Sequence, residues 1–170
     1  MNKGKLIVYY GEGEGKTSAA LGRAIRALGH NQKVMILQFM KGRETGEYKF
    51  LKKSDAKIKL CGPPVFLKRK KNFKIHSIKA KECLKETEKI IKEKKTDLLV
   101  LDEILYAIEF GLIKENELIK LIKERGKTNI ILTGREASIS FQRIADQVSK
   151  IVKIKHYFQK NKKSTKGLDL

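Results

Sequence analysis

The chain has 170 residues, of which 39 are Lys or Arg and 19 are Asp or Glu, so its formal net charge at pH 7 is +20. This length suits one folded domain, and no apolar run approaches the roughly 20 residues that a membrane-spanning helix needs. The positive charge makes nucleic acid a candidate partner. The lysines are spread along the chain, however, and aromatic residues are not interleaved with them, which argues against a nucleic-acid interface.

The first predicted element is a buried strand over residues 5–10, followed at once by a glycine-rich loop and a helix over 16–28. The loop reads Gly11-Glu12-Gly13-Glu14-Gly15-Lys16-Thr17-Ser18. Its glycines let several N–H groups point into one small space at the positive end of a helix, which suits a phosphate chain. Lys16 adds a mobile charge for the outer phosphates, and the Thr17 hydroxyl is placed to bind Mg²⁺. Tyr10 stands where the standard pattern has its first glycine, so we expect a variant nucleotide-binding loop.

Strands and helices alternate along the rest of the chain. After the first two elements we expect strands at 33–39, 56–60, 97–101, 129–132 and 147–154, and helices at 76–94, 104–110, 114–125 and 138–144. A polar loop over 41–50 is expected to lead into a further short helix. This alternation predicts a single α/β domain over 1–170, with a mainly parallel sheet, helices on both faces and a P-loop NTPase-like (RecA-like) arrangement. Residues 61–75 are expected to be irregular, and the polar tail over 156–170 to be mobile or ordered by a ligand.

The long helix over 76–94 is the most strongly charged element that we expect. Four residues are expected on its inner face. They are Ile78, Leu84, Thr87 and Ile91.

Polar side chains follow two of the later strands. Residues 98–101 lead into Asp102-Glu103, and an acidic pair after an apolar strand is the usual partner of a phosphate loop because it reaches the metal beside Thr17. Arg135 follows another strand, at the same edge of the sheet. Its planar guanidinium suits phosphate oxygens, and the alternative is a surface arginine that simply follows a turn. The sequence therefore predicts one nucleotide and metal site at this edge.

The remaining reactive residues show no catalytic pattern. His30, His76 and His156 have no partner at metal-ligand or triad spacing. Cys61 and Cys83 lie far apart, and we expect two reduced thiols. With no secretory leader and no membrane span, the chain is predicted to be cytoplasmic and without a membrane partner. The sequence thus predicts phosphate and metal binding but supplies no nucleophile or general base. The substrate would explain this absence if it brings the nucleophile itself.

The motifs together resemble the ATP:corrinoid adenosyltransferases of the CobA/CobO/BtuR type. The resemblance covers most of the chain except about residues 54–92, and the placement of the loop glycines is the family's own. It is carried by residues 11–18, 19–22, 26–30, 38–42, 46–47, 98–107, 110–112, 132–135, 145–146, 152–156 and 166–169.

The resemblance implies transfer of the 5′-deoxyadenosyl group of ATP to the Co(I) of a reduced corrinoid, with release of triphosphate. The eight loop residues would bind the nucleotide, Lys16 would stabilise the leaving triphosphate, and Arg135 would contact its terminal phosphate. Arg26 matches another nucleotide-contacting arginine. Thr17 and Glu103 match the family's metal-binding positions, so that Mg²⁺ is the expected cofactor, and Asp102 would support them.

The same resemblance implies a homodimer and a cobalt-reducing flavoprotein as partners. The chain departs from the family at Glu12 and Glu14, where asparagine and lysine are usual, and we expect weaker ATP affinity in consequence. It also lacks the family's tryptophan near the corrinoid, where Phe66 and Phe73 are its only aromatic residues. Two alternatives follow: a P-loop ATPase or kinase with a degenerate corrinoid site, or a basic nucleotide-dependent nucleic-acid-binding module.

Overall fold

The computed structural model describes residues 3–65, 67, 72–155, 165 and 167. The predicted tail over 156–170, the basic run 68–71 and Phe66 lie wholly or almost wholly outside this part of the chain. The elements are β1 (Leu6–Tyr10), α1 (Lys16–Leu28), β2 (Val34–Phe39), α2 (Gly46–Leu51), β3 (Lys57–Cys61), α3 (Phe73–Glu93), β4 (Leu98–Asp102), α4 (Ile104–Glu109), α5 (Glu115–Lys123), β5 (Asn129–Gly134), α6 (Ile139–Ile144) and β6 (Gln147–Lys150).

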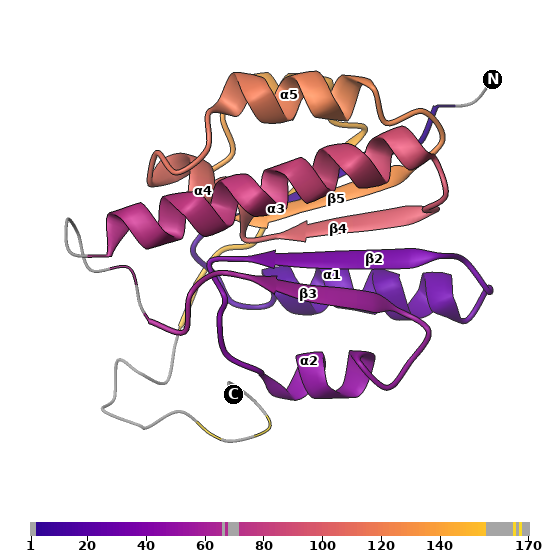
Figure 1. Ribbon diagram of the computed structural model, residues 1–170, viewed down its shortest axis with the longest axis horizontal. Coiled ribbons are helices and arrows are strands. Elements are labelled where there is room, and N and C mark those ends of the chain that lie inside the picture. Colours follow the sequence, from indigo (N-terminus) through magenta and orange to yellow (C-terminus); the bar gives the residue numbers. More distant parts are fainter. Residues whose placement is uncertain (1–2, 66, 68–71, 156–164, 166, 168–170) are drawn as a thin grey trace.

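The six strands form one sheet in the order β3-β2-β4-β5-β1-β6, and every neighbouring pair is parallel. The predicted α/β fold with a parallel sheet is therefore confirmed, and the strand order is consistent with a P-loop NTPase-like arrangement. Strand β5 lies between β1, which carries the glycine loop, and β4, which carries the acidic pair. The carboxyl ends of these strands meet at one edge of the sheet (Figure 1).

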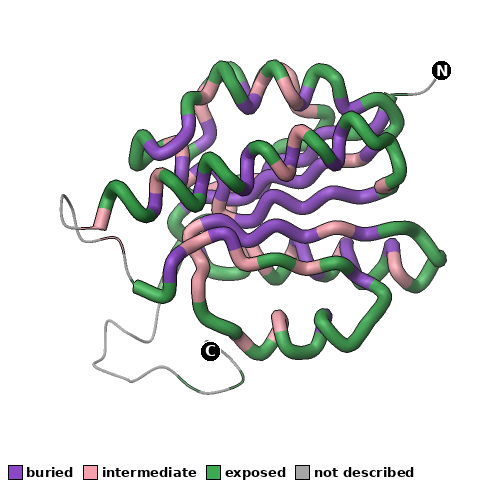
Figure 2. Tube along the Cα trace, viewed as in Figure 1, coloured by how far each residue is buried: buried purple, intermediate pink, exposed green. Residues whose placement is uncertain are grey.

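Alternating side chains send the apolar residues of the four inner strands β1, β2, β4 and β5 to both faces of the sheet, so these strands are buried almost throughout (Figure 2). The edge strands β3 and β6 are more exposed. One face packs against α1 and α2, where Ala20, Ala24 and Ala27 let the helix approach closely. The other face packs against α3, α4, α5 and α6. Helices on both faces were expected and are confirmed.

Helix α3 begins at Phe73, three residues before its predicted start, and its inner face differs from the expectation in one residue. Leu84, Thr87 and Ile91 are buried as predicted, but Ile78 is 47% exposed. The reason is geometric: successive helical residues are about 100° apart, so Ile78, nine residues before Thr87, lies on the opposite side of the helix from it. His76 takes the inner position, and its Nε2 lies 3.0 Å from the Val65 carbonyl oxygen.

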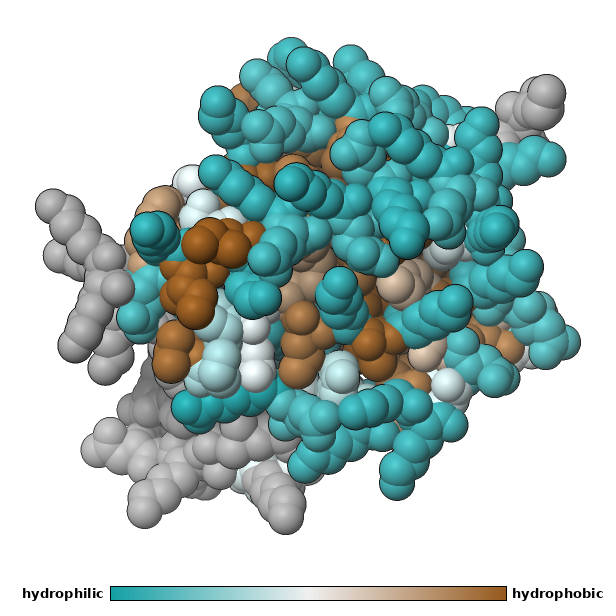
Figure 3. All heavy atoms as spheres, in the orientation of Figure 1, coloured by the Kyte–Doolittle hydropathy of each residue, from teal (hydrophilic) through white to brown (hydrophobic). Residues whose placement is uncertain are grey.

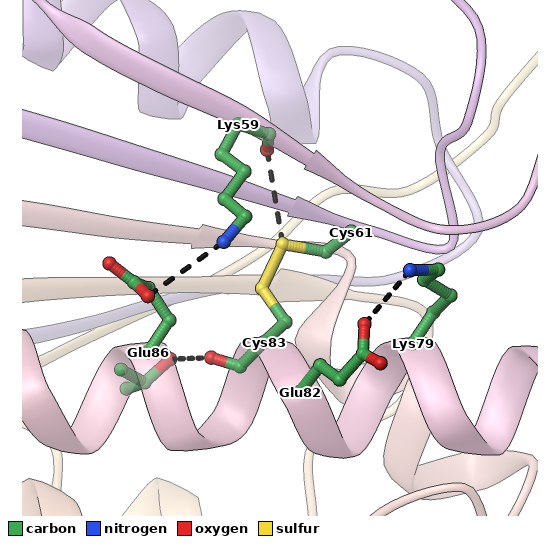
Figure 4. Close-up of a disulfide and its surroundings, with 7 residues drawn as sticks. Lys59, Cys61, Lys79, Glu82, Cys83 and Glu86 are labelled. Atoms are coloured by element: carbon green, nitrogen blue, oxygen red, sulfur yellow. Dashed lines mark hydrogen bonds and ion pairs between the residues drawn. A yellow bond between two sulfur atoms is a disulfide. The ribbon is translucent and has the colours of Figure 1, made fainter.

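Cys61 and Cys83 form a disulfide, so the prediction of two reduced thiols is wrong. Cys61 ends β3 and Cys83 lies on the inner face of α3, which crosses that strand end (Figure 4). The sequence separation of 22 residues concealed this approach, because it spans the irregular segment between the two elements. In the chain-entropy account, closing a loop of this length stabilises the fold by about 3 kcal/mol.

Hydrophilic side chains cover most of the face seen in Figure 3. An apolar patch lies over the start of α3, where Phe73, Ile75 and Ile78 are exposed. None of the helices in the described part of the chain has the length and apolar character to cross a bilayer.

Candidate functional site

The glycines of the 11–18 loop are required by its backbone and by the chain packed behind it. Gly11 and Gly15 have positive φ values of 121° and 100°. A Cβ atom on Gly11 would lie 2.2 Å from the carbonyl oxygen of Ile151, and one on Gly13 would lie 2.8 Å from the carbonyl of Val152. Tyr10 is still part of β1, paired with Gly134, so the first glycine is needed only at Gly11.

Hydrogen bonds hold the loop against β5 and the segment that follows β6. The Gly11 N–H donates to the Arg135 carbonyl oxygen at 2.8 Å, and the Gly13 N–H donates to that of Ile151 at 2.9 Å. The same contact explains why β6 ends at Lys150 and not at the predicted residue 154, because the chain turns at Ile151 to pack along the loop. Donors for a phosphate chain must therefore come from the remainder of the loop and from the first turn of α1.

Lys16 lies across the loop, where its Nζ donates to the Gly13 carbonyl oxygen at 2.6 Å. Burial lowers the pKa of this ammonium, against the opposing charges of Glu103, Glu14 and Asp102. A lysine that is partly desolvated and held by one carbonyl is ready to exchange that partner for a more strongly charged oxygen.

Asp102 is fully buried at the end of β4 and accepts four hydrogen bonds, two on each carboxylate oxygen. Oδ1 accepts from the hydroxyls of Thr17, at 2.9 Å, and Thr133, at 2.7 Å. Oδ2 accepts from Gln38 Nε2, at 3.1 Å, and Lys41 Nζ, at 3.0 Å. Every lone-pair direction of the carboxylate is thus used by the protein itself. Asp102 therefore suits the role of a residue that supports metal ligands better than the role of a metal ligand.

Glu103 follows Asp102 in the left-handed conformation, with φ 58°, and its N–H donates to Thr133 Oγ1 at 2.8 Å. Burial raises the pKa of its carboxyl group to about 7, while the nearby ammonium groups of Lys41 and Lys16 act in the opposite sense. No hydrogen bond to this carboxyl group is present in the part of the chain that the structure describes. It is therefore available for a ligand.

The donors beside the loop fit Mg²⁺, which prefers oxygen ligands and is commonly held by one or two protein groups together with phosphates and water. Thr17 offers a hydroxyl whose proton is directed to Asp102, and Glu103 offers a carboxyl group. Within the described ranges, no three His, Cys, Asp or Glu side chains gather to form an all-protein metal cage.

Lys41, Gln38 and Thr133 were not proposed as site residues from the sequence, yet they complete the surroundings of Asp102. Lys41 also lies 3.6 Å from Glu47, and although burial opposes its charge, Asp102 and its acidic neighbours raise its pKa. The signal that could have found these residues is register: in the sheet, Gln38 stands opposite Asp102. Register could not be read without the strand order.

Arg135 lies at the rim of the site, where its Nη2 contacts the carboxylate of Glu12 at 2.5 Å. The hydrogen bond with Arg135 holds the pKa of Glu12 below its usual value, and the reciprocal contact raises the pKa of Arg135. Both side chains are exposed, so the pair is open to solvent and to a ligand.

The remaining predicted residues are placed less centrally. Ser18 lies at the start of α1 and Glu14 lies in the loop before it, and both residues are exposed. Arg26 is exposed in the last turn of α1, ten residues beyond Lys16. At 1.5 Å per residue this is about 15 Å along the helix axis, so the structure does not bring Arg26 to the loop. Its nucleotide contact stays a prediction that the fold of one chain does not support.

Comparison with known proteins points in one direction. A family model described as "ATP:corrinoid adenosyltransferase BtuR/CobO/CobP" matches residues 2–170. The chain is 30% identical over 169 residues to a corrinoid adenosyltransferase of Escherichia coli (strain K12), covering 98% of this chain and 86% of that protein. It is also 30% identical over 169 residues to corrinoid adenosyltransferase CobA of Salmonella typhimurium, with the same coverage, and 28% identical over 173 residues to a Sinorhizobium protein, covering 98% and 80%.

Proposed function

This chain belongs to the ATP:corrinoid adenosyltransferase family, and from that premise we propose how its own residues carry out adenosyl transfer from ATP to a reduced corrinoid. In this reaction the cobalt(I) electron pair forms a bond to C5′ of the ribose. The bond between C5′ and its oxygen breaks, and that electron pair leaves with triphosphate. No proton has to be moved, which accounts for a site built from phosphate and cation ligands without a general base.

The observation that supports this assignment most directly is the position of the Asp102 network beside the loop. Thr17 and Glu103 are the residues that would hold Mg²⁺, which when bound neutralises charge on the triphosphate. Asp102 accepts a hydrogen bond from the Thr17 hydroxyl, so that a lone pair of this hydroxyl oxygen is left for the cation. The contribution of Asp102 is therefore orientation of Thr17.

Lys16 and Arg135 would stabilise the charge that builds on the leaving triphosphate. Each is held by a partner from the loop, the Gly13 carbonyl oxygen for Lys16 and the Glu12 carboxylate for Arg135. Binding of ATP would exchange both partners for phosphate oxygens. The free N–H groups of the first turn of α1 would complete the cradle.

We further propose that two copies of the chain associate, that a flavoprotein supplies the electrons that reduce cobalt, and that the reaction takes place in the cytoplasm. The support for these three points is the family's general pattern. The corrinoid would have to be recognised without tryptophan, since the chain contains none.

The test mixes the purified chain with ATP, Mg²⁺ and a chemically reduced corrinoid under anaerobic conditions. We expect the absorbance of the cobalt–carbon product to rise in step with triphosphate. Lys16→Ala is the matched variant, and we expect it to form both products about 100- to 1,000-fold more slowly while its circular dichroism remains that of the wild type. Release of orthophosphate without cobalt alkylation would instead indicate an ATPase or kinase, and tight, steeply salt-dependent binding of DNA or RNA would indicate the third alternative.

A further inference from the structure

Thr133 is a buried residue of β5 whose hydroxyl joins the two acidic residues at the end of β4. Its Oγ1 donates to Asp102 Oδ1 at 2.7 Å and accepts from the Glu103 N–H at 2.8 Å. A hydroxyl has one proton to donate and two lone pairs to accept with, so these two contacts fix its orientation. Thr133 is therefore a link between a carboxylate and a neighbouring peptide group.

The peptide that Thr133 holds is in an uncommon conformation. Glu103 has φ 58°, and non-glycine residues adopt this left-handed region only where the surroundings impose it. Gly134, the next residue of β5, allows α4 to approach so closely that an added Cβ would lie 2.4 Å from the Leu105 Cβ. The turn between β4 and α4 is thus pressed onto the end of β5, where the Thr133 hydroxyl meets it.

The same carboxylate of Asp102 also orients Thr17, whose hydroxyl donates to Oδ1 at 2.9 Å. Its second oxygen is clamped by Gln38 and Lys41, so the carboxylate cannot rotate to release one threonine without losing other bonds. Thr17 and Glu103 lie 86 positions apart in the sequence but are joined by a chain of three hydrogen bonds through Asp102 and Thr133.

We propose that Thr133 is a positioning residue for adenosyl transfer, which sets the distance between the Thr17 hydroxyl and the Glu103 carboxyl group before the cation arrives. This inference rests on the proposed function, because it takes Thr17 and Glu103 as the Mg²⁺ ligands. It differs from the roles of those two residues in that Thr133 itself contacts neither cation nor nucleotide. Its effect is expected on cation affinity and not on metal-free nucleotide binding.

The experiment compares Thr133→Val, which keeps the shape and removes the hydroxyl, with Thr133→Ser, which keeps the hydroxyl. Mn²⁺ serves as the probe, and its binding in the presence of ATP is followed by electron paramagnetic resonance of the free ion. We expect Mn²⁺ affinity to fall about 10- to 100-fold in Thr133→Val and to stay within about threefold of wild type in Thr133→Ser, as for other groups that orient metal ligands. ATP binding in EDTA should be unchanged in both.

Wild-type Mn²⁺ affinity in Thr133→Val, or an equal loss in Thr133→Ser, would overturn the inference. If the valine variant does not fold, Thr133→Ala provides the same test without an added methyl group. Glu103→Gln separates this inference from the proposed function. If that variant binds Mn²⁺ as tightly as wild type, the assignment of the cation site is wrong; if it binds weakly while Thr133→Val does not, only the role of Thr133 is wrong.

Discussion

The buried surroundings of Asp102 and the partly exposed glycine loop lie side by side, joined by the hydrogen bond from Thr17 to Asp102, but they are prepared for a ligand differently. At Asp102, each carboxylate oxygen is bonded to two donors from the chain itself, and the residue is fully buried. At the loop, Lys16 contacts the Gly13 carbonyl oxygen and Arg135 contacts the Glu12 carboxylate, and in the proposed function phosphate oxygens replace both of these partners. One region is complete before any ligand binds, whereas the other has to exchange partners.

The difference indicates where the fold keeps rigidity and where it permits change. Buried polar groups are expensive to leave unpaired, so the bonds that the Asp102 carboxylate accepts from its four donors depend on all of these residues. Exposed ion pairs contribute little to stability, so the rim can break its pair when ATP binds. Stability and nucleotide affinity should therefore respond to substitutions in different regions.

The largest effect on stability is expected from Asp102→Asn. This change leaves Lys41 partly buried without its carboxylate and turns an amide donor toward other donors. We expect the free energy of unfolding to fall by about 3–5 kcal/mol in urea titrations. The matched rim variant Glu12→Gln should leave it unchanged, and a similar loss in both variants would remove the contrast between the two regions.

Lys16→Ala should have the largest effect on catalysis with little effect on folding. Removal of a charge that stabilises the leaving triphosphate is expected to lower kcat/KM about 100- to 1,000-fold. The measurement is the initial rate of cobalt–carbon bond formation, with the thermal midpoint recorded beside it. Unchanged turnover would take the loop out of the mechanism.

Glu14→Lys restores the residue usual in the family and tests whether the acidic loop weakens nucleotide binding. We expect ATP to bind about three- to tenfold more tightly at low ionic strength, with the gain shrinking as salt is added. Glu93→Lys, at the end of α3 and at the opposite edge of the sheet, makes the same change of charge and serves as the control. Equal gains in both variants would mean that net charge alone is responsible.

The smallest effect on ATP affinity is expected when Arg135 is released from its ion pair with Glu12. In Glu12→Gln the guanidinium loses its present partner, and ATP binding, measured by calorimetry, should tighten by less than about fivefold because the pair is exposed. A tightening far beyond this would show that the rim resists rearrangement and would weaken the comparison.

The architecture was predictable because its signals are local. Apolar runs at 6–10 and 98–101 mark strands buried on both faces, and the alternation of strands with helices leads to a parallel sheet. The loop and the Asp102-Glu103 pair were likewise found from spacing alone. Their partners were not, because Gln38, Lys41 and Thr133 reach Asp102 only through strand order and register.

The two errors have different origins. Cys61 and Cys83 are joined because α3 crosses the end of β3, which no local pattern reveals. Ile78 was assigned to the inner face, although its phase on the helix places it on the outer side. The packing of one element on another decided the first outcome, whereas the second could have been read from the spacing of the residues.

The position of β1 in the sheet has a consequence for how the protein is made. This strand pairs only with β5 and β6, which emerge from the ribosome more than a hundred residues later. At synthesis rates of about 5–20 residues per second, the first strand waits several seconds for a neighbour. The nucleotide cradle can therefore form only after β5 and β6 have been synthesised, and a nascent chain that stops before them would expose an unpaired apolar strand to chaperones.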